Sequence, residues 1–174
     1  MFILFFCLSY FTLVRADDAS FDIPAKLLAR HTAICPEFNT ERGKYYMKGE
    51  YALPKSKYSK ETKTLYILGC EMYAYNSLEK AYILDAKDNI TDVYVAVIDH
   101  IRSITATADL MGAGYDEETF MLYTFQKGRG IGDCGSASTY LYNPEEEKFI
   151  LMEARLKNNC DGDIEADWPV IYSK

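Results

Sequence analysis

The sequence predicts a mainly β protein, an antiparallel sandwich or open barrel of about seven or eight short strands with one N-terminal helix. Runs of β-branched, aromatic and aliphatic residues recur at intervals of roughly 10 to 15 residues, which is typical of a strand-and-turn fold. No helical pattern alternates with these runs, so a parallel α/β sheet is disfavoured. An even number of cysteines after residue 17 favours a domain held by two disulfides.

The single helix is expected near the start of the chain. Residues 23–30 place Pro24 in the first helical turn and follow it with strong helix formers. The pair Cys35-Pro36 ends this pattern, because a residue before proline is disfavoured in the α region. Residues 39–63 are polar and rich in Tyr and Lys, which predicts a loop with a short strand between Tyr45 and Tyr51.

Strands are predicted where apolar and polar side chains alternate. The run 93–98 is apolar on both faces and is predicted to be a central strand. Residues 166–172 contain Pro169, which predicts an edge strand or no strand. The other strands are expected at 64–68, 81–84, 102–108, 120–125, 139–142 and 149–156, with a polar hairpin turn at 143–147.

The first 16 residues predict a secretory signal peptide. Phe2 to Val14 is an apolar run, and Val14-Arg15-Ala16 has the small-x-small pattern of a cleavage site. A membrane anchor is the alternative, but the run is shorter than the roughly 20 apolar residues that cross a bilayer. We therefore expect a mature chain of residues 17–174, folded as one domain, periplasmic or secreted, and without a membrane span after signal cleavage.

Four cysteines remain after the predicted cleavage. They are Cys35, Cys70, Cys134 and Cys160. Three pairings exist, and we favour Cys35–Cys70 with Cys134–Cys160, because each closes a loop of a few tens of residues and contributes about 3–4 kcal/mol in the chain-entropy model. Zinc binding is the competing use, but no Cys-x-x-Cys spacing occurs and only two histidines could assist. We expect no metal and no cofactor.

The charge of the chain limits its partners. With 26 acidic against 19 basic residues, the formal net charge is −7. An acidic surface without a Lys/Arg cluster argues against nucleic acid and anionic lipid, since both require cationic contacts. A cationic protein is a compatible partner, and solubility alone is the simpler explanation of the charge.

Residues 126–135 form the most distinctive stretch, in which glycines recur around Arg129 and lead to Cys134. Such a loop requires backbone conformations that most residues avoid, so we expect it to have a fixed shape. A dinucleotide site would need a helix to follow, and a strand is predicted instead. Arg129 lies near Asp133 and is suited to a two-pronged contact with an internal carboxylate or, alternatively, with a ligand.

Tyrosines are the other candidate binding residues. Tyr73 and Tyr75 follow Cys70, and tyrosine combines a large contact area with a polar tip, which suits protein or glycan recognition. Our candidate ligand-binding set is Arg129, Asp133, Tyr73 and Tyr75. Carboxylates at 161, 163, 165 and 167 are compatible with calcium, but they equally form one solvated face. No nucleophile motif is present, and we assign no catalytic residue.

Four motifs occur in a distinctive order between Thr64 and Tyr172. They are Gly69-Cys70-x-x-x-Ala74-Tyr75-Asn76, Lys127-Gly128-Arg129-Gly130-Ile131-Gly132-Asp133-Cys134-Gly135, Cys160-Asp161-Gly162 and Trp168-Pro169. Together they resemble an uncharacterised family of exported bacterial proteins known as domain of unknown function 1176. The resemblance implies a periplasmic or secreted location and disulfide use, with no catalytic assignment. Members are usually longer, so this chain resembles their C-terminal half.

These observations favour a non-enzymatic binding or inhibitor module of the cell envelope, with a cationic protein or a glycan as partner. One alternative is an envelope hydrolase in which Arg129, Asp133 and His100 converge in a cleft. A second alternative is a structural envelope component without a discrete site.

Overall fold

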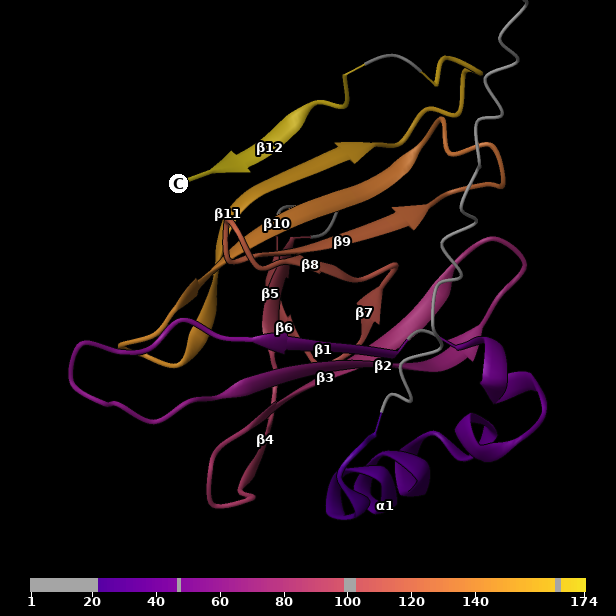
Figure 1. Cartoon of the computed structure of the whole chain (residues 1–174). Coiled ribbons are helices and arrows are strands. Elements are labelled where there is room, and N and C mark those ends of the chain that lie inside the picture. The colour runs from indigo at the N-terminus through magenta and orange to yellow at the C-terminus, as the bar shows by residue number, and fades with distance from the viewer. Residues whose placement is uncertain (1–21, 47, 99–102, 165–166) are drawn as a thin grey trace, which may run out of the picture.

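The computed structural model describes residues 22–46, 48–98, 103–164 and 167–174 (Figure 1). The predicted signal peptide lies outside the described residues. Within them, one α-helix, α1 (Ala25–Ile34), and two 3₁₀ turns, η1 (Pro36–Asn39) and η2 (Arg42–Tyr45), precede twelve strands. The prediction of a mainly β protein with one N-terminal helix is confirmed. The helix ends at Ile34, directly before the Cys35-Pro36 pair that was predicted to end it.

The strands form two larger antiparallel sheets and a separate hairpin. In the first sheet the order is β1 (Lys48–Ala52), β2 (Thr64–Met72), β3 (Ser77–Leu84) and β4 (Ile90–Asp92), and β7 (Leu110–Met111) also pairs with β3. In the second it is β12 (Val170–Ser173), β11 (Lys148–Lys157), β10 (Gly135–Asn143), β9 (Met121–Lys127) and β8 (Gly114–Asp116). The hairpin consists of β5 (Val95–Ile98) and β6 (Ile104–Thr107). Neither sheet closes into a barrel.

The expectation of a central strand at 93–98 is wrong. In the described part of the chain β5 pairs only with β6, and it lies against β11 of the second sheet. The run is apolar because Val95 is buried in the main core and its neighbours Ala96, Val97 and Ile98 pack against that core. A short strand can therefore be apolar on both faces by covering the side of a core, without strand partners on both edges.

Strand β2, like its neighbour β3, is buried on both faces. Its alternate residues Leu65 and Ile67 join the main core, which lies between the two sheets together with Leu122 and Tyr140 of the second sheet. The intervening residues, Tyr66 and Leu68, belong to a smaller core beneath α1 and η1. Figure 1 shows the resulting arrangement, with α1 on one side of the first sheet and the second sheet on the other. The edge strand expected near Pro169 is present as β12.

The structure contains two disulfides, and the favoured pairing is confirmed. Cys35–Cys70 joins the end of α1 to β2, and Cys134–Cys160 joins the start of β10 to the segment that follows β11. Their sequence separations are 35 and 26 residues. In the chain-entropy model each contributes about 3–4 kcal/mol.

Candidate binding surface

The glycine-rich loop that connects β9 to β10 is closed by its own backbone. The Gly128 amide donates to the Cys134 carbonyl at 2.8 Å, and the Gly132 amide donates to the Arg129 carbonyl at 3.0 Å. Gly132 has a φ of 73° and Gly135 a φ of 138°, both in the region that favours glycine. A Cβ atom at Gly135 would lie 1.9 Å from a carbonyl oxygen of β9. The glycines therefore permit a close turn that no other residue could occupy without a shift of the backbone.

An ion pair between the exposed Arg129 and the buried Asp133 fixes the same loop. Arg129 Nε donates to Asp133 Oδ1 at 2.7 Å, and Arg129 Nη2 donates to Asp133 Oδ2 at 2.5 Å. The Gly162 amide donates to Oδ2 at 2.6 Å, and Arg129 also donates to the Cys160 carbonyl at 3.1 Å. The Asp133 side chain is fully buried, whereas that of Arg129 is 46% exposed. The guanidinium is the main cause that holds the pKa of Asp133 far below its usual range, against the opposing effect of burial.

The expectation of an internal carboxylate partner for Arg129 is thus confirmed. A ligand contact by Arg129 or Asp133 stays a prediction. Because the Asp133 carboxylate is enclosed and already accepts three hydrogen bonds, its role in the structure is to position the loop. Arg129 retains half of its surface for contact with other molecules.

The turn between β2 and β3 is attached to this loop, although it lies about 50 residues earlier in the chain. Asn76 Nδ2 donates to the Lys127 carbonyl at 2.9 Å, and the Lys127 amide donates to Asn76 Oδ1 at 2.8 Å. The Tyr75 hydroxyl donates to the Gly128 carbonyl at 3.3 Å. These hydrogen bonds join the end of the first sheet to the end of the second. They bring Tyr75 close to the loop that carries Arg129.

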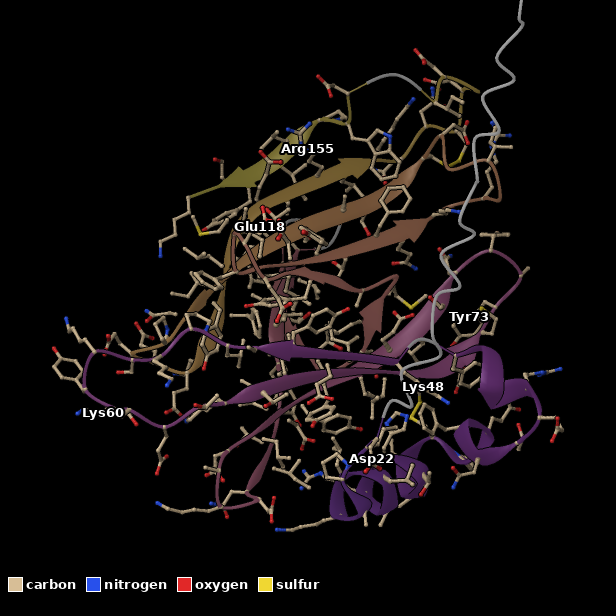
Figure 2. The ribbon with its side chains drawn as sticks, in the orientation of Figure 1. Asp22, Lys48, Lys60, Tyr73, Glu118 and Arg155 are labelled. Atoms are coloured by element: carbon tan, nitrogen blue, oxygen red, sulfur yellow. A yellow bond between two sulfur atoms is a disulfide. The ribbon has the colours of Figure 1, made fainter. Side chains whose placement is uncertain are left out.

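The joined turn and loop present apolar side chains to solvent. Tyr73 is 48% exposed, Tyr75 is 44% exposed and Ile131 is 60% exposed. Tyr73 lies at the β2–β3 end of the first sheet (Figure 2), and its hydroxyl donates to Glu71 at 2.7 Å. We call Tyr73, Tyr75, Arg129 and Ile131 the loop surface. The sequence analysis did not select Ile131. Its position within the glycine-rich loop was the signal that it would be exposed.

The groups near this surface that could bind a metal ion already have other partners. Asp133, Cys134 and Cys160 offer ligand atoms within 4.8 Å of one another, but the two sulfurs are bonded to each other. Lys157 Nζ donates to Asp161 Oδ1 at 2.8 Å and to the Asp163 carbonyl at 2.9 Å. The Asp161 carboxylate, the first of the four proposed for calcium, is therefore paired with an ammonium group. As a bridged cysteine, Cys134 is not an available nucleophile.

The hydrolase alternative depends on His100, which lies outside the described residues. Its convergence with Arg129 and Asp133 stays a prediction. The other histidine, His31, lies on the buried face of α1, where its ring nitrogens contact the Tyr82 hydroxyl at 3.0 Å and the Gly69 carbonyl at 2.9 Å. His31 is therefore a satisfied core residue.

This architecture defines a class of disulfide-bonded, mainly antiparallel β proteins with a rigid glycine loop at one end. The model of the family described as protein of unknown function (DUF1176) matches residues 30–174, and the chain belongs to this family. The match begins well before Thr64, where the motifs had placed its start. An uncharacterised protein, YpfG of Escherichia coli (strain K12), is 29% identical over 115 residues, which are 64% of this chain and 33% of that protein.

The chain thus matches a third of the length of this curated relative. No solved structure gives a significant match to the chain. Among the residues that the structure describes, no helix combines the length and the apolar character needed to cross a membrane.

Proposed function

We propose that this protein is an exported, non-enzymatic binding or inhibitor module of the cell envelope that binds a protein partner through the loop surface. The observation that carries the proposal is the exposure of Tyr73, Tyr75 and Ile131 on a backbone held by a disulfide, an ion pair and hydrogen bonds from both sheets. Aromatic side chains contribute a large share of binding energy at interfaces. A backbone that is already ordered loses little further entropy on association.

Charge supports a basic partner. The chain has a net charge of −7, and Glu71, Asp161 and Asp163 lie next to the loop surface in the hydrogen-bonded network described above. Opposite charge accelerates encounter and disfavours acidic competitors. The proposed partner is therefore a cationic protein of the envelope, and its capture should weaken as salt is added.

Export is part of the same proposal. Two disulfides are typical of proteins in oxidising compartments, which supports a periplasmic or secreted location. We propose that a signal peptide is cleaved after Ala16 and that residues 17–174 fold as one domain. The intact mass of protein purified from the envelope, measured before and after reduction and alkylation, would report the cleavage site and both bridges. A mass that includes residues 1–16, or free thiols before reduction, would contradict this part.

Binding is tested by immobilising the protein and exposing it to envelope extract at low salt. The wild type should retain a basic protein, and the double variant Tyr75→Ala/Ile131→Ser should lose it. The matched control is Tyr94→Ala/Ile104→Ser, which removes a tyrosine and an isoleucine that are 62% and 63% exposed elsewhere on the molecule.

The captured protein would then be purified and its affinity for each variant measured by calorimetry. Loss of one aromatic anchor typically weakens binding by at least about 2 kcal/mol, or roughly 30-fold. The proposal fails if nothing is captured at low salt, or if the loop-surface variant binds as tightly as the control. Thermal unfolding of each variant separates lost binding from lost structure.

A further inference from the structure

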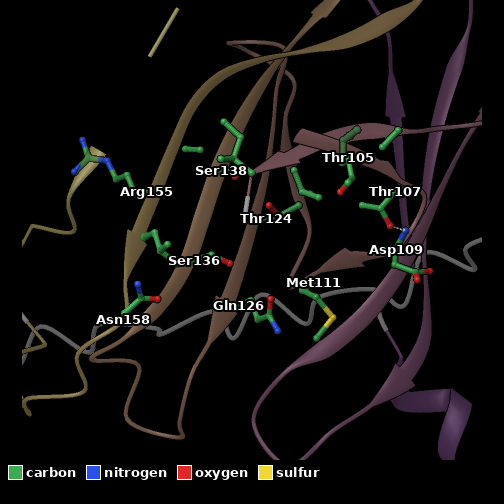
Figure 3. Close-up of a pocket in the computed structure, with 16 residues that line it drawn as sticks. Thr105, Thr107, Asp109, Met111, Thr124, Gln126, Ser136, Ser138, Arg155 and Asn158 are labelled. Carbon is green, nitrogen blue, oxygen red and sulfur yellow. Dashed lines mark hydrogen bonds between the residues drawn. The ribbon is translucent and has the colours of Figure 1, made fainter. Parts of the chain in front are cut away.

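A second feature, separate from the loop surface, is a groove between the β5–β6 hairpin and one end of the second sheet (Figure 3). Its volume is about 600 Å³, within the range of small-molecule sites. The floor carries Thr124 and Gln126 of β9 and Ser136 and Ser138 of β10. Ser138 lies opposite Thr124 and Ser136 lies opposite Gln126 in the β9–β10 register, so the four side chains share one face of the sheet.

This polar floor continues the core-facing side of β10. Alternate residues of a strand point to the same face, so Ser136 and Ser138 project on the side occupied further along by Tyr140 and Tyr142. Both tyrosines are buried in the main core. The inner face of the sheet thus changes from aromatic side chains to hydroxyl groups where the groove begins. Hydroxyl groups on an inward face add nothing to apolar packing, and a polar ligand would give them hydrogen-bond partners.

Two polar side chains of the groove have hydrogen-bonding capacity that no other described residue uses. Within the described part of the chain, the side chains of Gln126 and Ser136 make no hydrogen bond. The Tyr140 hydroxyl is fully buried and has no hydrogen-bond partner among the described residues. Burial raises the pKa of Tyr140. Tyr140 is two residues after Ser138 on the same face of β10, next to the groove but not part of its lining.

The groove offers no unpaired charge. Among its described lining residues the charged side chains are Asp109 and Arg155. Asp109 pairs with Lys80, and Arg155 donates to Glu153 at 2.5 Å. A charged ligand would therefore lose hydration without gaining a free counterion, which is unfavourable. The lining chemistry is suited to a neutral ligand.

The kind of neutral ligand follows from the backbone and the side chains together. A peptide could not extend the floor as an added strand, because β10 already pairs with β9 on one side and β11 on the other. A purely apolar ligand would leave the hydroxyl and amide groups dehydrated without partners. A sugar hydroxyl both donates and accepts, as do Ser, Thr and Gln side chains. Val95, Val97 and Met111 on the opposite wall provide contacts for the C–H face of a sugar ring.

We propose that the groove is a binding site for a neutral oligosaccharide. The site is distinct from the loop surface and does not depend on the proposed protein partner. Sugar hydroxyls would bond to Thr124, Gln126, Ser136 and Ser138.

The experiment is a titration of the ¹⁵N-labelled full-length protein with maltotriose and, separately, with triacetylchitotriose, followed by amide chemical shifts. Saturable shifts are expected for β9, β10 and the β5–β6 hairpin and not for the glycine loop. The double variant Thr124→Val/Ser138→Ala should weaken binding about tenfold or more, because it removes two hydrogen bonds. Gln126→Ala, at an exposed position of the same floor, should weaken it less and leave the fold unchanged.

The matched control is Thr139→Val, which removes a partly buried hydroxyl from the same strand on its opposite face. Its affinity should equal that of the wild type. The proposal is overturned if neither trisaccharide shifts the groove amides, or if the double variant binds both as tightly as the control. It is also overturned if decanoate shifts these amides and the sugars do not, because the groove would then be an apolar site. Capture experiments on the loop surface report a different set of residues, so either proposal can fail alone.

Discussion

The two disulfides of this protein span similar lengths of chain but lie in opposite chemical environments. Their separations of 35 and 26 residues give nearly the same loop-closure contribution, about 3–4 kcal/mol each. Cys35 and Cys70 are both buried next to the small apolar core beneath α1. In the second bridge Cys134 is buried and Cys160 is exposed, and the neighbouring groups are glycines, a half-exposed ion pair and backbone hydrogen bonds.

The difference shows that equal covalent links can have unequal structural roles. Around Cys35–Cys70 the segment is also held by apolar burial of Leu27 and Phe38 and by the satisfied ring of His31. The glycine loop has little apolar surface to bury, so its conformation depends on the disulfide and on polar contacts. Removal of either bridge should therefore weaken the fold, and removal of the second should in addition release the glycine loop.

Replacement of each cysteine pair by alanine tests this contrast, and it is expected to change the free energy of unfolding more than any other variant. Cys35→Ala/Cys70→Ala and Cys134→Ala/Cys160→Ala should each lower the free energy of unfolding by about 3–4 kcal/mol, measured by urea denaturation. Under native conditions, hydrogen exchange should accelerate throughout the loop only in the second variant. If the loop amides of this variant stay as protected as those of the wild type, the polar contacts suffice and the contrast is wrong.

His31 allows the apolar region to be tested alone. His31→Ala should lower the free energy of unfolding by about 2–3 kcal/mol, since it leaves the buried Tyr82 hydroxyl and the Gly69 carbonyl without partners. Burial lowers the pKa of His31 from 6.5, so the unfolded chain binds a proton more readily than the folded one. The stabilising contribution of neutral His31 is complete above pH 6.5. Below pH 6.5 it decreases by up to about 1.4 kcal/mol per pH unit.

The control for this prediction is His31→Gln, which keeps one donor and one acceptor but does not titrate. Urea midpoints between pH 5 and 8 should show a smaller loss of stability in acid for this variant than for the wild type. Equal slopes for the two proteins would mean that His31 does not contribute to the pH dependence.

The comparison also separates what the sequence predicts from what it does not. Alternation predicted most strands, and cysteine spacing favoured the correct pairing, because both are local properties. The run 93–98 was misplaced, since a strand covering the side of a core is as apolar as one in the middle of a sheet. The contact of Asn76 with Lys127 could not be predicted, because it depends on how two sheets meet. The groove joins residues of separate strands and left no motif.

Asn76 tests the link between the two sheets. Asn76→Ala removes both hydrogen bonds to the Lys127 backbone and should lower the free energy of unfolding by about 1–2 kcal/mol. Amide exchange at Lys127 should accelerate most, because its acceptor is lost. Asn89→Ala is the control, since among the residues that the structure describes the Asn89 side chain hydrogen-bonds to Asp85 of its own exposed turn. If the control lost as much unfolding free energy as Asn76→Ala, the hydrogen bonds between the two sheets would add nothing to stability.

The smallest effect is expected for Arg129→Lys, which keeps the charge and removes the two-pronged geometry. Arg129 is half exposed, so water replaces part of what is lost, and the melting temperature at pH 7 should fall less than for Asn76→Ala. Arg129 holds the pKa of Asp133 below its ordinary value of 3.8, and the resulting stability is present above pH 3.8 and lost as the pH falls through the folded-state pKa. The substitution should therefore move acid unfolding, followed by circular dichroism, to higher pH.

The control is Arg155→Lys, which should move acid unfolding less, because Glu153 and Arg155 are both about one-third exposed. An equal shift in the two variants would contradict a special role for the enclosed Asp133 carboxylate.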